Sequence, residues 1–223
     1  GLGAGALPQP AAEQHGAACL GYVAPVLVVT GTRREAAVLK GRAGIKTLAI
    51  GGRADLLDDL ATPFRAVVSF GMAGGLRRNL HIGDWVVGEG VCGKFWGECD
   101  PEWSAKLASS IPNAETGLIF ADGHLIDDVG EKYDTYINYR TLAVDMESHL
   151  AGELAKRAGV PFAIVRCISD EVDHSLPAVV AVAMKPDGSL ALTEIVKAIT
   201  RNPAQVPEII STFRNFIAAY RAF

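Results

Sequence analysis

The apolar residues of this chain gather in short, continuous runs rich in β-branched side chains, and several of these runs close at glycine. Such runs predict strands that are buried on both faces, because a strand with one wet face would alternate apolar and polar residues. The predicted strands cover residues 25–31, 46–52, 65–71, 84–91, 116–123 and the two ends of 142–169.

Segments of helical composition alternate with these strands, as at 53–61. The clearest unit is 142–169, in which a strand is followed by a helix, by Gly159 as the helix C-cap and by a second strand. Because this alternation implies crossover connections, we predict one α/β domain at 23–223, with a mixed, mostly parallel central sheet flanked by helices. Residues 1–22 are rich in Gly, Ala and Pro without a period, which is typical of a flexible N-terminal tail.

The end of the chain predicts two more helices, near 193–200 and at 206–222. In the second helix, apolar side chains recur at helical spacing and share one face. We expect this face to pack on the sheet or on a subunit partner, and contact with a membrane is the alternative, since Arg214 and Arg221 flank it. The face consists of Ile209, Ile210, Phe213, Phe216, Ile217, Tyr220 and Phe223.

Composition narrows the class of protein. The chain has 223 residues, of which 49% are hydrophobic and 21% charged, as in soluble globular domains. A net charge of −4 argues against a nucleic-acid partner and against a polybasic lipid-binding surface. The four scattered cysteines form no CxxC pair, and the N-terminus lacks the features of a signal peptide, so we expect reduced thiols in the cytoplasm. No apolar run approaches the ~20 residues of a membrane-spanning helix.

Candidate chemistry lies where the predicted strands end, because ligands of open α/β sheets bind beyond the carboxyl ends of the strands. The first strand ends at Gly31, Thr32 and Arg33, and the second at Gly52 and Arg53. Glycine N–H groups together with guanidinium groups can hold an anion such as phosphate. The third strand leads into "GMAGGL", and later strands lead into "ADGHLID", "DMES" and "SDEVD". This combination suits a ligand with an anionic part and a polyhydroxylated or basic part.

Several common motifs are missing. "FGMAGGL" has neither the GxGxxG spacing of dinucleotide-binding folds nor the GK[ST] of a P-loop, so it predicts either a tight turn or a close backbone approach. The five histidines show no metal-ligand spacing, and we predict no metal site. No G-x-S-x-G elbow is present, which disfavours a serine hydrolase.

Two acidic stretches allow both structural and chemical interpretations. In "DMES", the acids Asp145 and Glu147 suit a helix N-terminus, but a carboxylate there can also accept hydrogen bonds from a diol. In "SDEVD", Asp170 is either a helix cap or a carboxylic acid that keeps its proton because other acids are close, as general acid catalysis requires. Its neighbours Glu171 and Asp173 either raise its pKa or simply face water.

Taken together, "VVTGTRREAAVL", "SFGMAGGL", "GDWVVGEGV", "GLIFADGHLID" and "AVDMESHLAGELAKRAGVPFAIVRCISDEVD" resemble the superfamily of purine nucleoside phosphorylases and methylthioadenosine/S-adenosylhomocysteine nucleosidases. The resemblance runs from about residue 25 to 185. The segment "LPAVVAVAMKPDGSLALTEIVKAITRNPAQVPEII" is similar to the hopanoid-associated phosphorylase branch, which is also described as adenosylhopane nucleosidase. The resemblance implies the three-layer fold of the nucleoside phosphorylases.

The resemblance also implies roles for single residues. Asp170 falls on the general acid that protonates N7 of the purine, and Glu147 falls on the carboxylate that binds the ribose 2′ and 3′ hydroxyls. Met146 falls on the residue that packs against the sugar. Glu35 matches the glutamate of the nucleosidases that positions or activates the attacking water.

The purine-binding residues implied by the resemblance are Leu125 and Ile126, which flank the base, and Ala73 and Gly74, which lie beneath base and sugar. This chain departs from the nucleosidases twice. They carry an aromatic residue at the position of Leu125 and a serine at the position of Met72.

The resemblance implies cleavage of the N-glycosidic bond of a 5′-substituted purine nucleoside, specifically adenosylhopane in hopanoid biosynthesis, with release of adenine. Gly31, Thr32, Arg33, Gly52 and Arg53 form the predicted phosphate seat, which favours phosphorolysis with inorganic phosphate as co-substrate and no other cofactor. Hydrolysis is the first alternative and a non-catalytic nucleoside-binding protein is the second.

The expected partners are the nucleoside, which can be lipid-linked, and further copies of the chain in a homo-oligomer. We expect neither nucleic acid nor an integral membrane span. The expected location is the cytoplasm or the periphery of the inner membrane.

Overall fold

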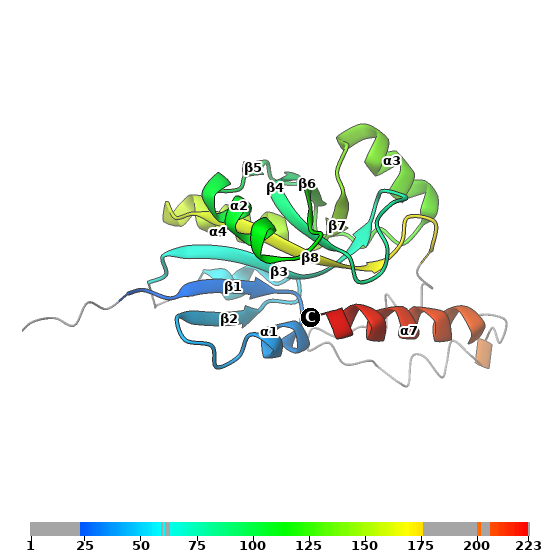
Figure 1. Cartoon of the computed structure of the whole chain (residues 1–223), viewed down its shortest axis with the longest axis horizontal. Helices are drawn as coiled ribbons and strands as arrows, with labels where there is room; N and C mark the ends of the chain where they lie inside the picture. Colours follow the sequence, from blue (N-terminus) through cyan, green and yellow to red (C-terminus); the bar gives the residue numbers. More distant parts are fainter. Residues whose placement is uncertain (1–22, 59, 61–62, 176–199, 202–205, 223) are drawn as a thin grey trace, which may run out of the picture.

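The structure, a computed structural model, describes residues 23–58, 60, 63–175, 200–201 and 206–222. One mixed sheet of eight strands forms its centre (Figure 1). The strands are β1 (Val26–Thr30), β2 (Ile45–Ala49), β3 (Ala66–Gly75), β4 (Trp85–Gly93), β5 (Gly97–Glu98), β6 (Glu115–Ala121), β7 (Ala143–Asp145) and β8 (Phe162–Asp170).

Five of the eight strands pair in a closed ring. Strand β3 pairs with β7 on one side and with β8 on the other, and β8 continues through β4 and β6 back to β7. Strands β1 and β2 extend from β3 as a parallel edge. Both parallel and antiparallel pairs occur, so the predicted mixed, mostly parallel sheet is confirmed.

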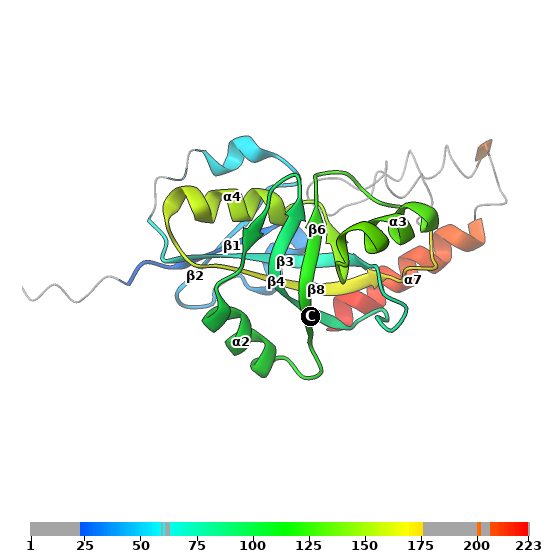
Figure 2. The ribbon, with the colours of Figure 1, turned by 90° about the horizontal axis from the view of Figure 1, so that it is seen from above.

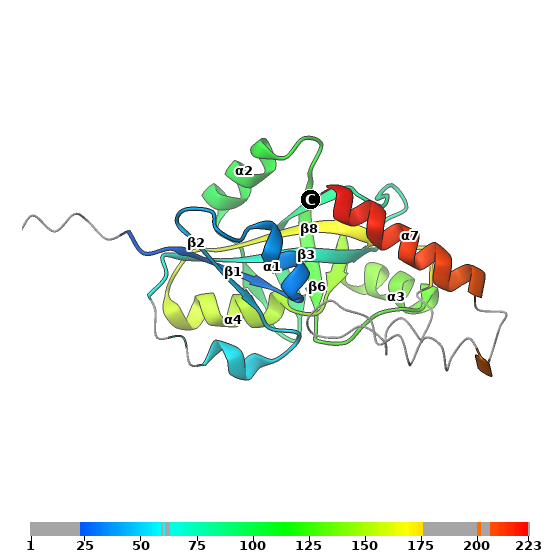
Figure 3. The ribbon, with the colours of Figure 1, turned by 90° about the horizontal axis from the view of Figure 1, so that it is seen from below.

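Helices cover both faces of the sheet (Figures 2 and 3). Helix α4 (Ser148–Ala158) and the 3₁₀ turn η1 (Ala54–Leu57) share the larger apolar core with strands β1 and β3. Helix α2 (Pro101–Ser110) and residues at the end of α1 (Arg33–Val38) pack on the opposite face. Helix α3 (Val129–Tyr139) follows β6, and α7 (Val206–Ala222) lies along β8. The layers are those of an α/β domain, as predicted.

The unit β7–α4–β8 matches its prediction closely. Gly159 ends α4 in the left-handed conformation with φ 63°, where glycine avoids the strain of a side chain. Every residue of β8 is buried, as the continuous apolar run predicts.

Other predicted boundaries are wrong. Among the described residues of 53–61, the helical part is the four-residue turn η1, and Arg53 offers no side-chain cap. Strand β3 continues through "GMAGG" to Gly75 instead of ending at Gly71, because this stretch pairs with both β7 and β8. The helices α2 and α3 lie outside the predicted segments, although Asp100 and Asp128 cap their N-termini.

Helix α7 packs on β8, but its buried face differs from the predicted one. Ile209 and Ala219 are buried, whereas Ile210 and Ile217 are each 53% exposed. The predicted apolar face is therefore too wide, because it includes residues from two neighbouring sides of the helix. Residues 1–22, Phe223 and most of 193–200 lie outside the described residues.

The described cysteines Cys92, Cys99 and Cys167 are free and buried. Burial raises the pKa of Cys92 to about 11 and that of Cys99 and Cys167 to about 12, so these thiols stay protonated. In the part of the chain that the structure describes, no helix is both long and apolar enough to cross a membrane.

Candidate active site

Two of the predicted acids lie against glycines of the strands that hold the site. A methyl carbon added at Gly31 would lie 3.0 Å from Glu147 Oε1, and one at Gly74 would lie 3.0 Å from Asp170 Oδ2. Such distances are tighter than most contacts of a Cβ atom, so a side chain at either position would force the carboxylate to shift. The glycines at these positions therefore allow a carboxylate to lie close to the backbone.

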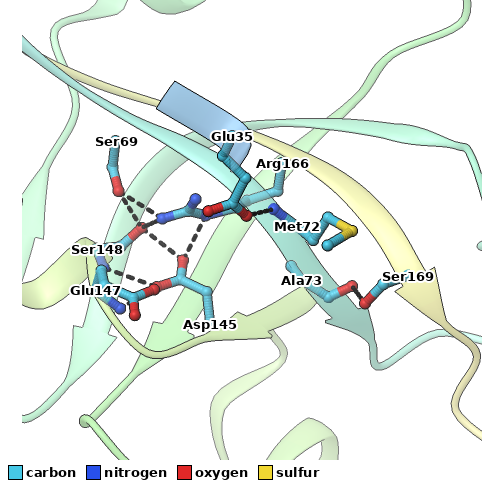
Figure 4. Close-up of polar contacts among 9 residues, drawn as sticks. All are labelled: Glu35, Ser69, Met72, Ala73, Asp145, Glu147, Ser148, Arg166 and Ser169. Atoms are coloured by element: carbon cyan, nitrogen blue, oxygen red, sulfur yellow. Dashed lines mark hydrogen bonds and ion pairs between the residues drawn. The ribbon is translucent and has the colours of Figure 1, made fainter. Parts of the chain in front are cut away.

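Glu35 meets a third glycine. A methyl carbon at Gly71 would lie 2.6 Å from Glu35 Oε1 and 2.8 Å from Arg166 Nη1, so Gly71 makes room for both side chains. Figure 4 shows Glu35 and Arg166 in this region. Glu35 is 4% exposed and comes from the first turn of α1. Glu35 thus lies against Gly71 and Asp170 against Gly74, three residues apart along β3.

The Glu35 carboxylate is held by donors from two strand ends. Its Oε2 accepts from Thr32 N at 2.7 Å and from Thr32 Oγ1 at 2.9 Å, and its Oε1 accepts from Met72 N at 2.8 Å. Thr32 and Glu35 form a capping box, which explains why α1 begins here. Tyr220 of α7 hydrogen-bonds with Thr32, and burial raises the pKa of this tyrosine.

A buried network beneath the site holds the "DMES" turn. Arg166 is 1% exposed, and its Nε donates to Asp145 Oδ2 at 2.8 Å while its Nη2 donates to Ser69 and Ser148 (Figure 4). Asp145 also accepts from the backbone N–H groups of Glu147 and Ser148. Asp145 therefore has the structural role at the helix N-terminus. The sequence signal for Arg166 is a lone charge within an apolar strand, and we missed it.

Glu147 faces the site from this turn, and its carboxylate forms no ion pair among the described residues. Burial raises the pKa of Glu147 to about 8, and the negative charges of Asp145 and Glu35 add to this effect, while Arg166 opposes it. In the unliganded site the carboxyl group therefore keeps its proton at neutral pH. The predicted diol-binding role requires the ionised form, which this site disfavours until a ligand is bound.

Asp170 is the last residue of β8 and is 3% exposed. Its Oδ1 lies 2.7 Å from Ser169 Oγ, and its Oδ2 accepts from Lys132 Nζ at 2.5 Å. Ser169 Oγ also lies 3.2 Å from the carbonyl oxygen of Ala73. Because a hydroxyl has one proton, Ser169 can donate to an ionised Asp170 or can accept from a protonated one while it donates to Ala73.

The other acids of "SDEVD" point elsewhere. Glu171 Oε1 lies 3.1 Å from His81 Nδ1, and Asp173, which is 74% exposed at its side chain, lies 3.1 Å from His174 Nδ1. The charged group nearest to Asp170 is thus the cation of Lys132 and not another acid. Among the described residues, Glu171, Asp173 and His174 are close enough to share a metal ion, and Glu171 also lies against His81.

The residues predicted for the base and sugar differ in their exposure. Ala73 and Ile126 are buried, Met146 is half-buried, and Leu125 is 37% exposed. A cleft of about 290 Å³ opens beside Asp170, between the turn after β8 and helix α7. Its lining residues are Asp170, Asp173, His174, Ser175, Ser211, Thr212 and Asn215.

Several of the residues predicted to bind phosphate are exposed or have other partners. Arg53 forms an ion pair with Asp55 at the surface, and Arg33 and Gly52 are exposed. Thr32 gives both its N–H and its hydroxyl to Glu35. Both donors of Thr32 are therefore already satisfied by a carboxylate.

Sequence comparison agrees with this geometry: the sequence model of the Phosphorylase superfamily matches residues 25–201. The chain belongs to the Phosphorylase superfamily. The match covers the sheet and every candidate residue named above.

Solved structures of low sequence identity share the fold. The 5′-methylthioadenosine/S-adenosylhomocysteine nucleosidase of Helicobacter pylori is 18% identical with a TM-score of 0.59, over 67% of this chain and 86% of that one. Futalosine hydrolase of Helicobacter pylori is also 18% identical with a TM-score of 0.57, over 69% and 90%. The nucleosidase of Streptococcus pneumoniae bound to 8-aminoadenine is 15% identical with a TM-score of 0.58, over 67% and 88%.

Proposed function

We propose that this protein cleaves the N-glycosidic bond of a 5′-substituted purine nucleoside and that water is the nucleophile. The observation that supports this most is the placement of Glu35, Glu147 and Asp170 around the glycine-bearing ends of β1 and β3. A protein that only binds a nucleoside needs no buried acid at the base. Membership of the Phosphorylase superfamily supports the same reaction class.

The chemistry assigns a different role to each carboxyl group. As the bond breaks, positive charge develops on the ribose and negative charge on the purine. Protonated Asp170 gives its proton to N7 of the purine, and Ser169 then turns its hydroxyl toward the carboxylate that remains. Glu147, once ionised, accepts hydrogen bonds from the ribose diol and stabilises the cationic sugar.

The contacts of Glu35 favour water over phosphate. Its carboxylate occupies the backbone donor of Met72 and both donors of Thr32, so negative charge already fills the place where a phosphate would need positive groups. Repulsion between this carboxylate and a phosphate dianion would oppose phosphorolysis. A water molecule beside Glu35 would instead be oriented, and could lose a proton to it, on attack at C1′.

The 5′ substituent follows from sequence resemblance and not from the geometry. Resemblance to the hopanoid-associated branch makes adenosylhopane the first substrate to test, and methylthioadenosine, S-adenosylhomocysteine and futalosine follow from the fold neighbours. Each is a purine nucleoside that differs at the 5′ position or in the base.

The test is a turnover assay in phosphate-free buffer made with H₂¹⁸O, in which free purine and the sugar product are analysed by mass spectrometry. We expect purine release at full rate and one ¹⁸O at C1′ of the sugar. A requirement for added phosphate, with ribose-1-phosphate as product, would refute water as the nucleophile and would support the phosphorylase version.

A further inference from the structure

Lys132 is a buried cation whose position no motif in the sequence indicates. It lies on α3, is 0% exposed, and ranks among the largest fully buried side chains of the described residues. Lysine is almost never fully buried unless it is paired. Its burial at the acid end of the site therefore calls for an explanation.

The contacts of Lys132 define its charge. Its Nζ donates to Asp170 Oδ2 at 2.5 Å, to the Glu171 carbonyl at 2.9 Å and to the His174 carbonyl at 2.8 Å. An ammonium group has three protons for these three acceptors, whereas a neutral amine has only two. The arrangement is thus complete only for the charged form of Lys132.

One side chain therefore fixes both the acid and the turn that follows it. The two carbonyl bonds tie α3 to the turn after β8, which forms one wall of the cleft beside Asp170. The third bond holds Oδ2 of Asp170, so that its carboxyl group cannot rotate freely. Because Lys132 has no exposed surface, it acts on a ligand only through Asp170 and this turn.

We propose that Lys132 is a positioning residue that anchors Asp170 through Oδ2 and fixes the turn that forms one wall of the cleft. The proposal deepens the function proposed above, since it assigns the control of the acid to a residue 38 positions away.

The other charged groups around Asp170 do not produce the same effect. Glu171 is paired with His81, and Asp173 is paired with His174, on the more exposed side of the turn. From α7, the cleft receives only the uncharged side chains Ser211, Thr212 and Asn215.

The test is hydrogen–deuterium exchange of the backbone amides of residues 171–174 in the wild type and in Lys132→Met, which keeps the length of the side chain. We expect these amides to exchange about tenfold faster in Lys132→Met, because the two carbonyl bonds that tie the turn to α3 are lost. Lys106→Met, at an exposed lysine of α2, is the control and should leave the exchange unchanged. Unchanged exchange in folded Lys132→Met would overturn the proposal, and this readout does not depend on any substrate.

Kinetics supply the second readout. In Lys132→Met, we expect kcat to fall about 10- to 100-fold through misplacement of the acid, with KM within about threefold of the wild type because Lys132 touches no ligand. If Lys132→Met does not fold, Lys132→Met/Asp170→Asn, which buries neither charge, is compared with Asp170→Asn. Equal kcat in these two variants supports action through Asp170, and a further tenfold loss in the double variant would contradict it.

The two proposals can fail separately. If the wild type releases no purine from any nucleoside, the proposed function fails, and the exchange measurement still decides the role of Lys132. If the wild type turns over but the exchange of the turn is the same in Lys132→Met, only the role of Lys132 fails.

Discussion

Glu147→Gln should make the unliganded protein more stable at alkaline pH while it removes activity. Burial and neighbouring acids raise the pKa of Glu147 from 4.5 to about 8, so folding favours the protonated form. Between these two values the unfolded chain is ionised and the folded chain is not. The stability of the wild type therefore falls as pH rises through this window, and the loss is complete above pH 8.

The magnitude follows from the two pKa values. Their difference, at about 1.4 kcal/mol for each pH unit, corresponds to about 5 kcal/mol. Glu147 is only half-buried, so water screens part of this cost and we expect about 2 kcal/mol. The glutamine introduced by Glu147→Gln does not titrate and is nearly the same size as glutamate, so the variant should escape the loss.

The assay is urea unfolding of both proteins at pH 5 and at pH 9. The stability of Glu147→Gln relative to the wild type should rise by about 2 kcal/mol between these pH values, and turnover should fall at least about 100-fold. Glu98→Gln, at an exposed glutamate, is the matched control and should show neither effect. If Glu147→Gln gains no stability at pH 9, the carboxylate is not destabilised in the free site and our reasoning is wrong.

Three further results are expected from the same site. Gly71→Ala should destabilise the protein by about 1–3 kcal/mol in urea unfolding and lower turnover, because the added methyl group would meet Glu35 and Arg166. Gly75→Ala is the control, since the nearest neighbour of its added methyl group lies at 3.4 Å. Equal effects of the two changes would refute the specific contact at Gly71. Arg166→Met should cost about 3–5 kcal/mol, since Asp145 would be left as a buried, unpaired carboxylate; a loss below about 1 kcal/mol in urea unfolding would contradict this. The kcat/KM of the wild type should rise with pH toward about 8, as Glu147 ionises and can stabilise the cationic sugar, and should lose this rise in Glu147→Gln; a flat profile in the wild type would argue against the role of Glu147.

The sheet was largely predictable because its strands are buried on both faces and carry continuous apolar runs. The extension of β3 to Gly75 was not, because glycines are poor strand formers by local preference. Only the pairing with β7 and β8 makes this stretch a strand, and that pairing joins residues far apart in the chain.

The same limit applies to the site. The sequence indicated Glu35, Glu147 and Asp170 because each follows a predicted strand or begins a helix within a recognisable motif. Lys132 and the bonds of Arg166 to Ser69 and Ser148 could not be inferred, since they join positions up to 97 residues apart. Local pattern shows which residue types stand at strand ends, but only the register between strands decides which side chains meet.

The role of Asp170 is the central claim, and one comparison tests it most directly: free adenine released from adenosylhopane and from methylthioadenosine by the wild type and by Asp170→Asn at pH 7. Asparagine keeps the size of the side chain but cannot give up a proton to N7. We expect steady adenine release by the wild type and a rate about 100- to 10,000-fold lower in the variant. Equal rates in the two proteins, or tight nucleoside binding by the wild type without any adenine, would contradict the account.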